Sequence, residues 1–386
     1  MKYDFESIID RKNAGSFKWN AMKSACPEVE DGIVPLSVAD MEFYNAPEII
    51  EGLKEHLSHT VLGYTGPTDA YFDAVISWME RRHGFSPKRE WIVQTPGIVP
   101  ALHDIVKALT SPDDAVIVFP PVYYPFFSAV RDNGRKLIAS PLVKTGLRYE
   151  IDFDDFEKKA KLKDASMCIF CSPHNPVGRV WTSDEVERVS RICRDNNLIF
   201  VCDEIHHDLI LPDYKHVSAA VFSEYLDNLV LCTAPSKTFN LAGMQTSNLI
   251  VPSKLLRERL QNAGGYFSLN ALGYKACELA YNRCESWLDE LMTVIDRNRL
   301  TVERHMAKHH PAVTVYPLEG TYLQWLDLSA LGMPYRQMEK FLVEKARLFT
   351  DEGSLFGQEG NGFIRINLAC PTSVIEAALE RFTKAL

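Results

Sequence analysis

The 386-residue sequence predicts an α/β protein: a large domain with a mostly parallel seven-stranded sheet between helices, plus a smaller α+β domain. Three observations support this. Short apolar, β-branched runs alternate with helical periodicity over the first 250 residues, and this pattern changes after residue 285. The composition, 46% hydrophobic and 24% charged, is that of a folded globular chain rather than a disordered or coiled-coil one. The length, well above the ~150 residues usual for one domain, allows two packed units.

Seven apolar runs are the expected strands of the large domain. They span 91–95, 115–119, 136–142, 166–171, 198–202, 229–233 and 247–251. Helical periodicity fills most of the gaps, at 69–82, 99–110, 123–134, 153–163 and 183–195. Thr182 and Glu185 have the spacing of a capping box before the last of these helices. Because alternating strands and helices form parallel crossovers, ligands are expected to bind beyond the carboxyl ends of the strands.

The remaining third of the chain predicts the smaller domain. Apolar residues from Cys284 to Ile295 recur at i, i+3, i+4 and i+7, which predicts a long helix that runs to about residue 308. Shorter elements follow: strands at 313–316, 321–326 and 363–367, a helix at 335–346, and a final helix after Pro371 with Ser373 and Glu376 as its capping box. We assign residues 1–45 to an N-terminal arm and part of the small domain, 46–285 to the large domain, and 286–386 to the small C-terminal α+β domain.

Charge and cysteine content exclude several function classes. The net charge of −9 repels phosphate backbones and anionic lipids, so neither nucleic acid nor a membrane is an expected partner. No apolar run approaches the ~18 residues of a membrane span, and the charged N-terminal stretch does not resemble a signal peptide, so a cytoplasmic location is expected. Nine cysteines scattered through apolar stretches predict reduced, buried thiols. Cys168 and Cys171 fall on opposite faces of one strand, which favours a core role over metal or redox chemistry.

Five segments that follow expected strands carry the functional signal. They read TPGIVPAL, PPVYYPF, SPHNPVGR, DEIHHD and APSKTFNLAG in chain order. Together they resemble the pyridoxal 5'-phosphate (PLP) dependent, fold-type I enzymes of the class I/II aminotransferase superfamily, over essentially the whole chain. The segments DRKNAGSFKWN, PLSVADMEF, LGYTGP, PHNPVGRVW and DEIHHDL narrow this resemblance to the MalY/PatB-type carbon–sulfur β-lyases, also called cystathionine β-lyases.

The resemblance implies that Lys237, in SKTFNLAG, forms a Schiff base with PLP. An ordinary lysine titrates near ~10.4, so it acts near neutral pH only when it is desolvated or joined to an electron-poor carbonyl. The resemblance also places Asp203 beside the pyridine nitrogen, which then stays protonated and makes the ring an electron sink. The alternative interpretations are a solvated Ser–Lys pair for Lys237, and a helix cap or loop acceptor for Asp203.

The resemblance implies two further cofactor contacts, both at the phenolic oxygen. Asn175 in HNPVG resembles the residue whose amide donates to the phenolic oxygen, and His206, three residues after Asp203, is the implied second donor. Aminotransferases commonly carry Tyr at this position, whereas the lyase branch carries His, so His206 favours the lyase interpretation. A core histidine is the alternative for His206. The other histidines lack metal-ligand spacing, and no metal is expected.

The phosphate of PLP needs hydrogen-bond donors. Ile98 and Val99 open a helix after Gly97, so their backbone amides are able to bind a phosphate at the helix N-terminus. The resemblance adds the hydroxyls of Ser236 and Thr233.

A departure from the superfamily makes an extra donor important. Many aminotransferases place Arg eight residues after the lysine, whereas this chain has Gln245, which leaves the phosphate with less positive charge beside it. The resemblance implies that Tyr64, in LGYTGP, reaches the phosphate from the partner subunit of a homodimer with active sites at the interface. An ordinary turn aromatic is the alternative for Tyr64.

Two residues are expected to act on the substrate. Tyr123 in PPVYYPF resembles the aromatic that stacks on the cofactor ring, with its hydroxyl near the departing group; a core aromatic is the alternative. Arg365 in GFIRINLACP corresponds to the clamp for the substrate α-carboxylate, because its planar guanidinium meets a carboxylate in bidentate fashion. A surface salt bridge is the alternative for Arg365.

These residues predict a PLP-dependent carbon–sulfur β-lyase that converts cystathionine, cysteine or an S-substituted cysteine to pyruvate, ammonia and a thiol. The expected binding partner is therefore a small molecule, namely an amino-acid substrate. A PLP-dependent aminotransferase is the first alternative, because transamination shares the early steps. A PLP-binding regulatory protein that works through a surface partner is the second. The preferred thioether stays open, because side-chain selectivity depends on pocket shape, which no motif encodes.

Overall fold

A seven-stranded sheet forms the centre of the computed structural model, which describes residues 1–263 and 269–386. The strand order is β1-β9-β8-β7-β6-β2-β3. The strands are β1 (Ile92–Thr95), β2 (Ala115–Val118), β3 (Lys136–Ala139), β6 (Ala165–Cys171), β7 (Ile199–Asp203), β8 (Leu229–Thr233) and β9 (Ser247–Ile250). Strand β9 runs antiparallel to its two neighbours, and the other paired strands are parallel. The predicted mostly parallel sheet of seven strands is confirmed.

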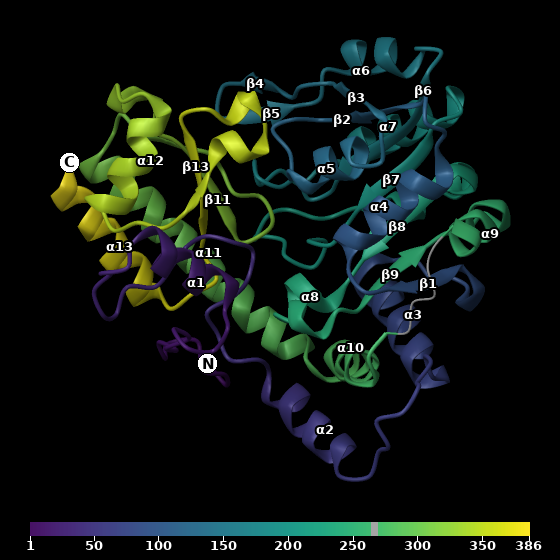
Figure 1. Cartoon of the computed structure of the whole chain (residues 1–386), viewed down its shortest axis with the longest axis horizontal. Helices are drawn as coiled ribbons and strands as arrows, with labels where there is room; N and C mark the ends of the chain where they lie inside the picture. The colour runs from purple at the N-terminus through teal and green to yellow at the C-terminus, as the bar shows by residue number, and fades with distance from the viewer. Residues whose placement is uncertain (264–268) are drawn as a thin grey trace.

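Helices cover both faces of this sheet (Figure 1). Apolar residues of α4 (Ile98–Leu109), α5 (Pro125–Arg131) and α9 (Lys254–Ala263) share one core cluster with alternate strand residues. The opposite face is covered by α3 (Asp69–His83), α6 (Phe153–Ala160), α7 (Ser183–Asp195) and α10 (Ala271–Arg283). Cys168 lies in the second cluster and Cys171 in the first, which confirms that they point to opposite faces. The capping box of Thr182 and Glu185 at the start of α7 is also confirmed.

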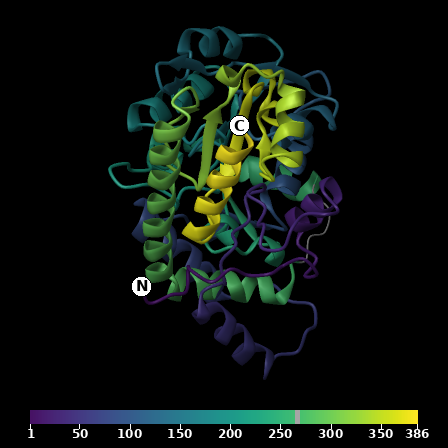
Figure 2. The same ribbon diagram turned by 90° about the vertical axis from the view of Figure 1, so that its left-hand side faces the viewer.

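A second, antiparallel sheet with the order β10-β11-β13-β12 lies beside the first (Figure 1). Its strands are β10 (Thr314–Val315), β11 (Leu323–Asp327), β12 (Asp351–Glu352) and β13 (Phe363–Asn367). The long helix α11 (Glu285–His309) packs alongside α13 (Thr372–Ala385), and α12 (Tyr335–Glu344) completes the layer (Figure 2). One core cluster runs through both units and takes in N-terminal residues such as Phe5 and Trp19. The domain boundaries at residues 45 and 285 stay a prediction.

Some elements differ from those expected. The capping box of Ser373 and Glu376 is wrong: Pro371 occupies the N-cap of α13, and the helix begins at Thr372, so Ser373 already lies inside it. The sequence did not predict α1 (Phe17–Ala25), α2 (Pro47–Leu57), the hairpin of β4 (Val143–Thr145) and β5 (Arg148–Glu150), the short helix α8 (Pro235–Thr238), α9, α10 or the two-residue strand β12. Within the described residues, each helix is too short or too polar to cross a membrane.

Candidate active site

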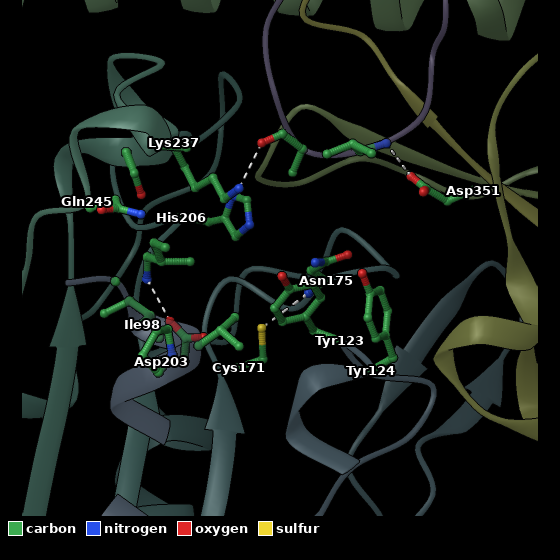
Figure 3. A pocket seen from close by; sticks show the side chains of 18 of the residues that line it. Ile98, Tyr123, Tyr124, Cys171, Asn175, Asp203, His206, Lys237, Gln245 and Asp351 are labelled. Atoms are coloured by element: carbon green, nitrogen blue, oxygen red, sulfur yellow. Dashed lines mark hydrogen bonds between the residues drawn. The ribbon is translucent and has the colours of Figure 1, made fainter. Parts of the chain in front are cut away.

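A cavity of about 220 Å³ lies where the large sheet meets the small one (Figure 3). Asp203 ends β7, Asn175 follows β6, and Arg365 lies on β13 of the small sheet. Nine predicted site residues line the cavity: Ile98, Val99, Tyr123, Asn175, Asp203, His206, Ser236, Lys237 and Arg365. Residues far apart in the sequence are therefore gathered in one place, because the carboxyl ends of parallel strands meet at one edge of a sheet.

Lys237 lies on the short helix α8 (Pro235–Thr238), which follows β8. Its amine donates a hydrogen bond to the carbonyl oxygen of Ala39 at 2.7 Å. Desolvation, and then the positive charge of Arg365, lower the pKa of Lys237 to about 8. The neighbouring Thr238 anchors the helix, because its hydroxyl donates to buried Asp208 at 2.7 Å. The structure thus holds an amine of lowered pKa at the cavity wall.

Asp203 is a buried carboxylate at the end of β7. Its Oδ1 accepts the backbone N–H of Ile205 at 3.1 Å. Removal from water raises the pKa of Asp203 to about 7, which shows that its charged form is poorly compensated in the ligand-free chain. A buried carboxylate of this kind gains free energy from a cationic partner, so this end of the cavity favours a ligand with a protonated nitrogen.

His206 lies buried near Lys237, and its Nδ1 has no hydrogen-bond partner among the residues that the structure describes. Burial and the nearby charges of Lys237 and Arg365 lower the pKa of His206 well below its usual value, so the ring is neutral. A buried polar atom without a partner is uncommon in folded proteins. His206 nevertheless lines the cavity, so its ring is placed to contact a polar ligand group.

Arg365 is almost completely buried and is held from two sides. Its Nη1 donates to Asn175 Oδ1 at 2.7 Å, and its Nη2 donates to Asp351 Oδ2 at 2.6 Å. Because Arg365 takes the amide oxygen of Asn175, the amide nitrogen of Asn175 is its donor for a ligand. Tyr123 packs close by: its backbone N–H donates to the carbonyl of Asn175 at 3.1 Å, and burial raises the pKa of its hydroxyl.

The N-terminus of the 12-residue helix α4 opens on the cavity. The helix begins at Ile98, as predicted, and follows Gly97, which adopts φ +140° and has no side chain to cap the first amides. Such amides and the helix dipole favour an anion. Ser236 lies on the same wall. Thr233 is buried nearby without reaching the lining, and its hydroxyl has no partner within the described ranges.

The residues present fit PLP. The uncapped start of α4 and Ser236 would hold its phosphate, and Asp203 would face its ring nitrogen. Lys237 presents an amine for its aldehyde. The ring of His206 and the amide nitrogen of Asn175, both on the cavity wall, would serve its ring oxygen.

Tyr64 is not brought into this cavity by its own chain. It is fully exposed, in the segment after α2 that extends from the body of the molecule (Figure 1). Together with Pro96 and Gln245 it lines a second, more open hollow of about 640 Å³. Gln245 lines both hollows, so Tyr64 lies on the outer side of the cavity wall.

Several cavity residues were missed from the sequence: Val38, Ala39, Tyr124, Cys171 and Asp351. Asp351 is the most informative of them, because it lies directly across from Arg365 in the pairing of β12 with β13. An acidic residue opposite an arginine on a neighbouring strand is a recognisable sign of a cross-strand ion pair. A strand of two residues, however, has too little alternation to be found from the sequence.

A histidine cluster behind the cavity does not have the geometry of a metal site. Ring nitrogens of His83, His207 and His216 approach within 4.8 Å of one another. However, the His83 and His207 rings are stacked, with centroids 3.8 Å apart and planes 17° apart. Imidazole lone pairs lie in the ring plane, so stacked rings do not point at one ion. His83 and His216 instead contact the carboxylates of Asp208 at 2.9 Å and Glu204 at 3.0 Å.

Comparison with known proteins agrees with this geometry. The family model of aminotransferase class I and II matches residues 31–382. The cystathionine beta-lyase PatB of Bacillus subtilis is 38% identical over 387 residues, which cover 99% of this chain and 100% of that protein. Cystalysin from Treponema denticola, solved with PLP, is 48% identical, with a TM-score of 0.98 and coverage of 100% and 99% of the two chains. The PLP-bound C-S lyase from Staphylococcus hominis is 31% identical, with a TM-score of 0.92 and coverage of 100% and 98%.

Proposed function

The chain belongs to the class I and II aminotransferase family, and on this basis we propose that it is a PLP-dependent carbon–sulfur β-lyase. Its substrates are cystathionine, cysteine or S-substituted cysteines, and with one water it releases pyruvate, ammonia and a thiol. The cavity in which Lys237, Asp203 and Arg365 meet carries this proposal, since it places an amine, a ring-nitrogen partner and a carboxylate clamp around one space. The lyases among its relatives favour this outcome over transamination.

Each of these residues has a separable task. When bound, PLP supplies an electron sink for the charge that develops at the substrate Cα. The guanidinium of Arg365 binds the α-carboxylate and orients the substrate. The amine of Lys237, with its pKa lowered to about 8, takes the proton from Cα. Asp203 keeps a negative charge beside the ring nitrogen.

Tyr123 is placed to assist the departing sulfur. Burial raises the pKa of its hydroxyl, so the group stays protonated and is able to donate a hydrogen bond to the departing sulfur. Its ring lies beside Asn175 on the cavity wall, where it would also pack against the cofactor (Figure 3). Such a hydrogen bond would stabilise the negative charge that develops on the sulfur as the carbon–sulfur bond breaks.

The products distinguish the proposed lyase from an aminotransferase. We expect purified, PLP-loaded protein to convert cystathionine and S-methylcysteine to equal amounts of pyruvate and thiol, measured by mass spectrometry. A parallel reaction with alanine and a keto acid should give far less product, because alanine has no β-leaving group and reacts only by transfer of its amino group. A new amino acid formed at the higher rate, with no thiol released from either thioether, would identify a transaminase instead.

We also propose that the active unit is a homodimer in which each site borrows Tyr64 from the partner chain. Val61, Leu62 and Tyr64 are 86%, 67% and 100% exposed, so an apolar segment is left uncovered by its own chain. A patch of this kind favours association with another protein surface. The second hollow, which this segment lines together with Gln245, lies next to the phosphate end of the cavity. We take this second surface to be another copy of the chain, because only a second copy brings its own Tyr64 to the phosphate end of the cavity.

Tyr64→Phe is expected to weaken PLP retention about 10-fold to 100-fold. The reason is that a hydrogen bond to a charged group contributes about 1.5 to 3 kcal/mol, and ~1.4 kcal/mol corresponds to one decade in affinity. Titration of the cofactor-free protein with PLP, followed by absorbance, measures the change. Wild-type affinity in the variant would remove Tyr64 from the phosphate site.

Hybrid dimers test whether the contact crosses the interface. When Tyr64→Phe protein is mixed with Lys237→Ala protein, a shared site places both lesions in one half of the dimer and leaves the other half intact. Recovery of wild-type PLP affinity in that half supports sharing. A mixture that behaves as the average of its parents, despite proven subunit exchange, shows that Tyr64 serves its own chain or neither.

A further inference from the structure

One oxygen of Asp351 serves two groups that belong to different parts of the cavity wall. Oδ2 accepts hydrogen bonds from Nη2 and Nε of Arg365 at 2.6 Å and 3.2 Å. The same oxygen accepts the backbone N–H of Val38 at 2.9 Å. The side chains of Arg365 and Asp351 are only 3% and 13% exposed, so water screens their charges weakly. Asp351 therefore links the substrate clamp to the N-terminal segment that passes over the cavity.

That segment, which we call the strap, comprises residues 38–40. Val38 has φ +57°, a left-handed conformation that β-branched residues rarely adopt unless their surroundings impose it. Asn367 holds the other side of the strap, since its amide donates to the carbonyls of Val38 at 2.6 Å and Asp40 at 2.8 Å. Between them, the carbonyl of Ala39 accepts the amine of Lys237 at 2.7 Å. The conformation of the strap thus sets the position of the Ala39 carbonyl, which accepts the hydrogen bond from Lys237.

Arg365 keeps a free edge for a ligand. A guanidinium has five N–H donors. Asp351 takes the donor on Nε and one on Nη2, and Asn175 takes one on Nη1. One donor therefore remains on each Nη, which is the pair that a carboxylate binds in bidentate fashion. A substrate carboxylate bound there shares the single positive charge of Arg365 with Asp351.

We propose that Asp351 is a positioning residue with two separable effects: its charge limits how tightly Arg365 binds a carboxylate, and its oxygen holds the strap against Lys237. The inference rests on the role of Arg365 in the proposed function. Two substitutions separate the effects. Asp351→Asn removes the charge but keeps an oxygen that accepts the N–H of Val38, whereas Asp351→Ala removes both.

The charge effect is tested with a ligand that cannot react. The probe is 3-(methylthio)propionate, a thioether carboxylate that lacks an α-amino group, titrated calorimetrically into PLP-loaded protein at pH 8. We expect its Kd to be about tenfold lower for Asp351→Asn than for wild type, because a like charge beside the bound carboxylate is gone. A structural defect would raise Kd instead. An unchanged or raised Kd contradicts the charge effect.

Glu352→Gln is the matched control for this titration. Glu352 is the neighbouring residue on β12 and lies outside the cavity lining. Burial raises the pKa of Glu352 to about 7, so at pH 8 this variant also removes a negative charge, but away from Arg365. We expect it to keep the wild-type Kd. A tenfold lower Kd here as well would mean that net charge, rather than Asp351, sets the affinity.

The strap effect is tested by hydrogen–deuterium exchange on the PLP-loaded protein without ligand. The amide of Val38, followed in overlapping peptides within residues 33–45, should exchange about tenfold faster in Asp351→Ala, because its N–H loses its acceptor. Asp351→Asn should exchange like wild type. Equal exchange in the alanine variant and wild type contradicts the hold on the strap.

Arg365→Ala separates this inference from the proposed function. The variant should bind 3-(methylthio)propionate at least tenfold more weakly than wild type. Wild-type binding by Arg365→Ala would refute the carboxylate clamp itself, and with it the assignment on which the inference rests. Weak binding by Arg365→Ala together with a wild-type Kd for Asp351→Asn would leave the clamp in place and refute only the role of Asp351.

Discussion

Lys237→Ala is expected to abolish covalent attachment of PLP and to lower turnover by about 10³-fold or more. In the proposed mechanism the amine is both the nucleophile for the cofactor aldehyde and the base for the substrate Cα, and a positioned base alone contributes about 10²-fold to 10⁴-fold. Burial and the charge of Arg365 lower the pKa of Lys237 to about 8. A larger fraction of the amine is therefore neutral near pH 8 than for an ordinary lysine. After substitution by alanine, the side chain at position 237 has no amine for either task.

Borohydride reduction followed by peptide mass mapping measures this attachment. The wild-type protein should carry the reduced cofactor on Lys237 and on no other lysine, and Lys18 is the internal control. Lys18 is also buried, but its amine pairs with Glu42 at 2.9 Å and does not line the cavity. A variant that keeps a borohydride-fixed cofactor would show that another residue is the attachment point.

Much of the site could be predicted from the sequence because it follows the ends of buried strands. Asp203, Asn175 and Lys237 each come shortly after an apolar run, and in a parallel sheet such ends meet at one edge. The start of α4 at Ile98 was readable from Gly97 and the apolar periodicity that follows. The strand pattern predicts where these residues lie, whereas their roles, and that of Arg365, came from the resemblance to a known family.

The missed features depend on contacts that leave no local pattern. Asp351 lies on a strand of two residues, and its role becomes visible only when β13 is paired beside it. The left-handed conformation of Val38 has no sequence signal, because valine is among the residues least suited to it and is held there by Asp351 and Asn367. Tyr64 is fully exposed on its own chain, and the role proposed for it needs a second subunit, which leaves no pattern in the sequence of one chain.

Asp203→Asn is expected to lower kcat by about 10²-fold to 10³-fold while KM for the amino acid changes only a few-fold. A negative charge beside the ring nitrogen stabilises the charge that develops during reaction, and losing one such preorganised group costs about this much. In the proposed mechanism substrate binding depends instead on Arg365, which lines the cavity and is unchanged in this variant. The fold is expected to survive, because the asparagine oxygen is still able to accept the N–H of Ile205, as Asp203 does at 3.1 Å.

Single-turnover rates with S-methylcysteine separate the chemical step from binding in this variant. Asp203→Asn should saturate at a substrate concentration close to that of wild type but at a much lower limiting rate. Arg365→Ala is the opposite control, since it should shift saturation to far higher substrate concentrations. The burial that raises the pKa of ligand-free Asp203 to about 7 also explains why the charge matters, because a carboxylate that is poorly compensated alone interacts strongly with a cation placed beside it. An Asp203→Asn protein with the wild-type limiting rate and only a raised KM would show that Asp203 binds rather than activates.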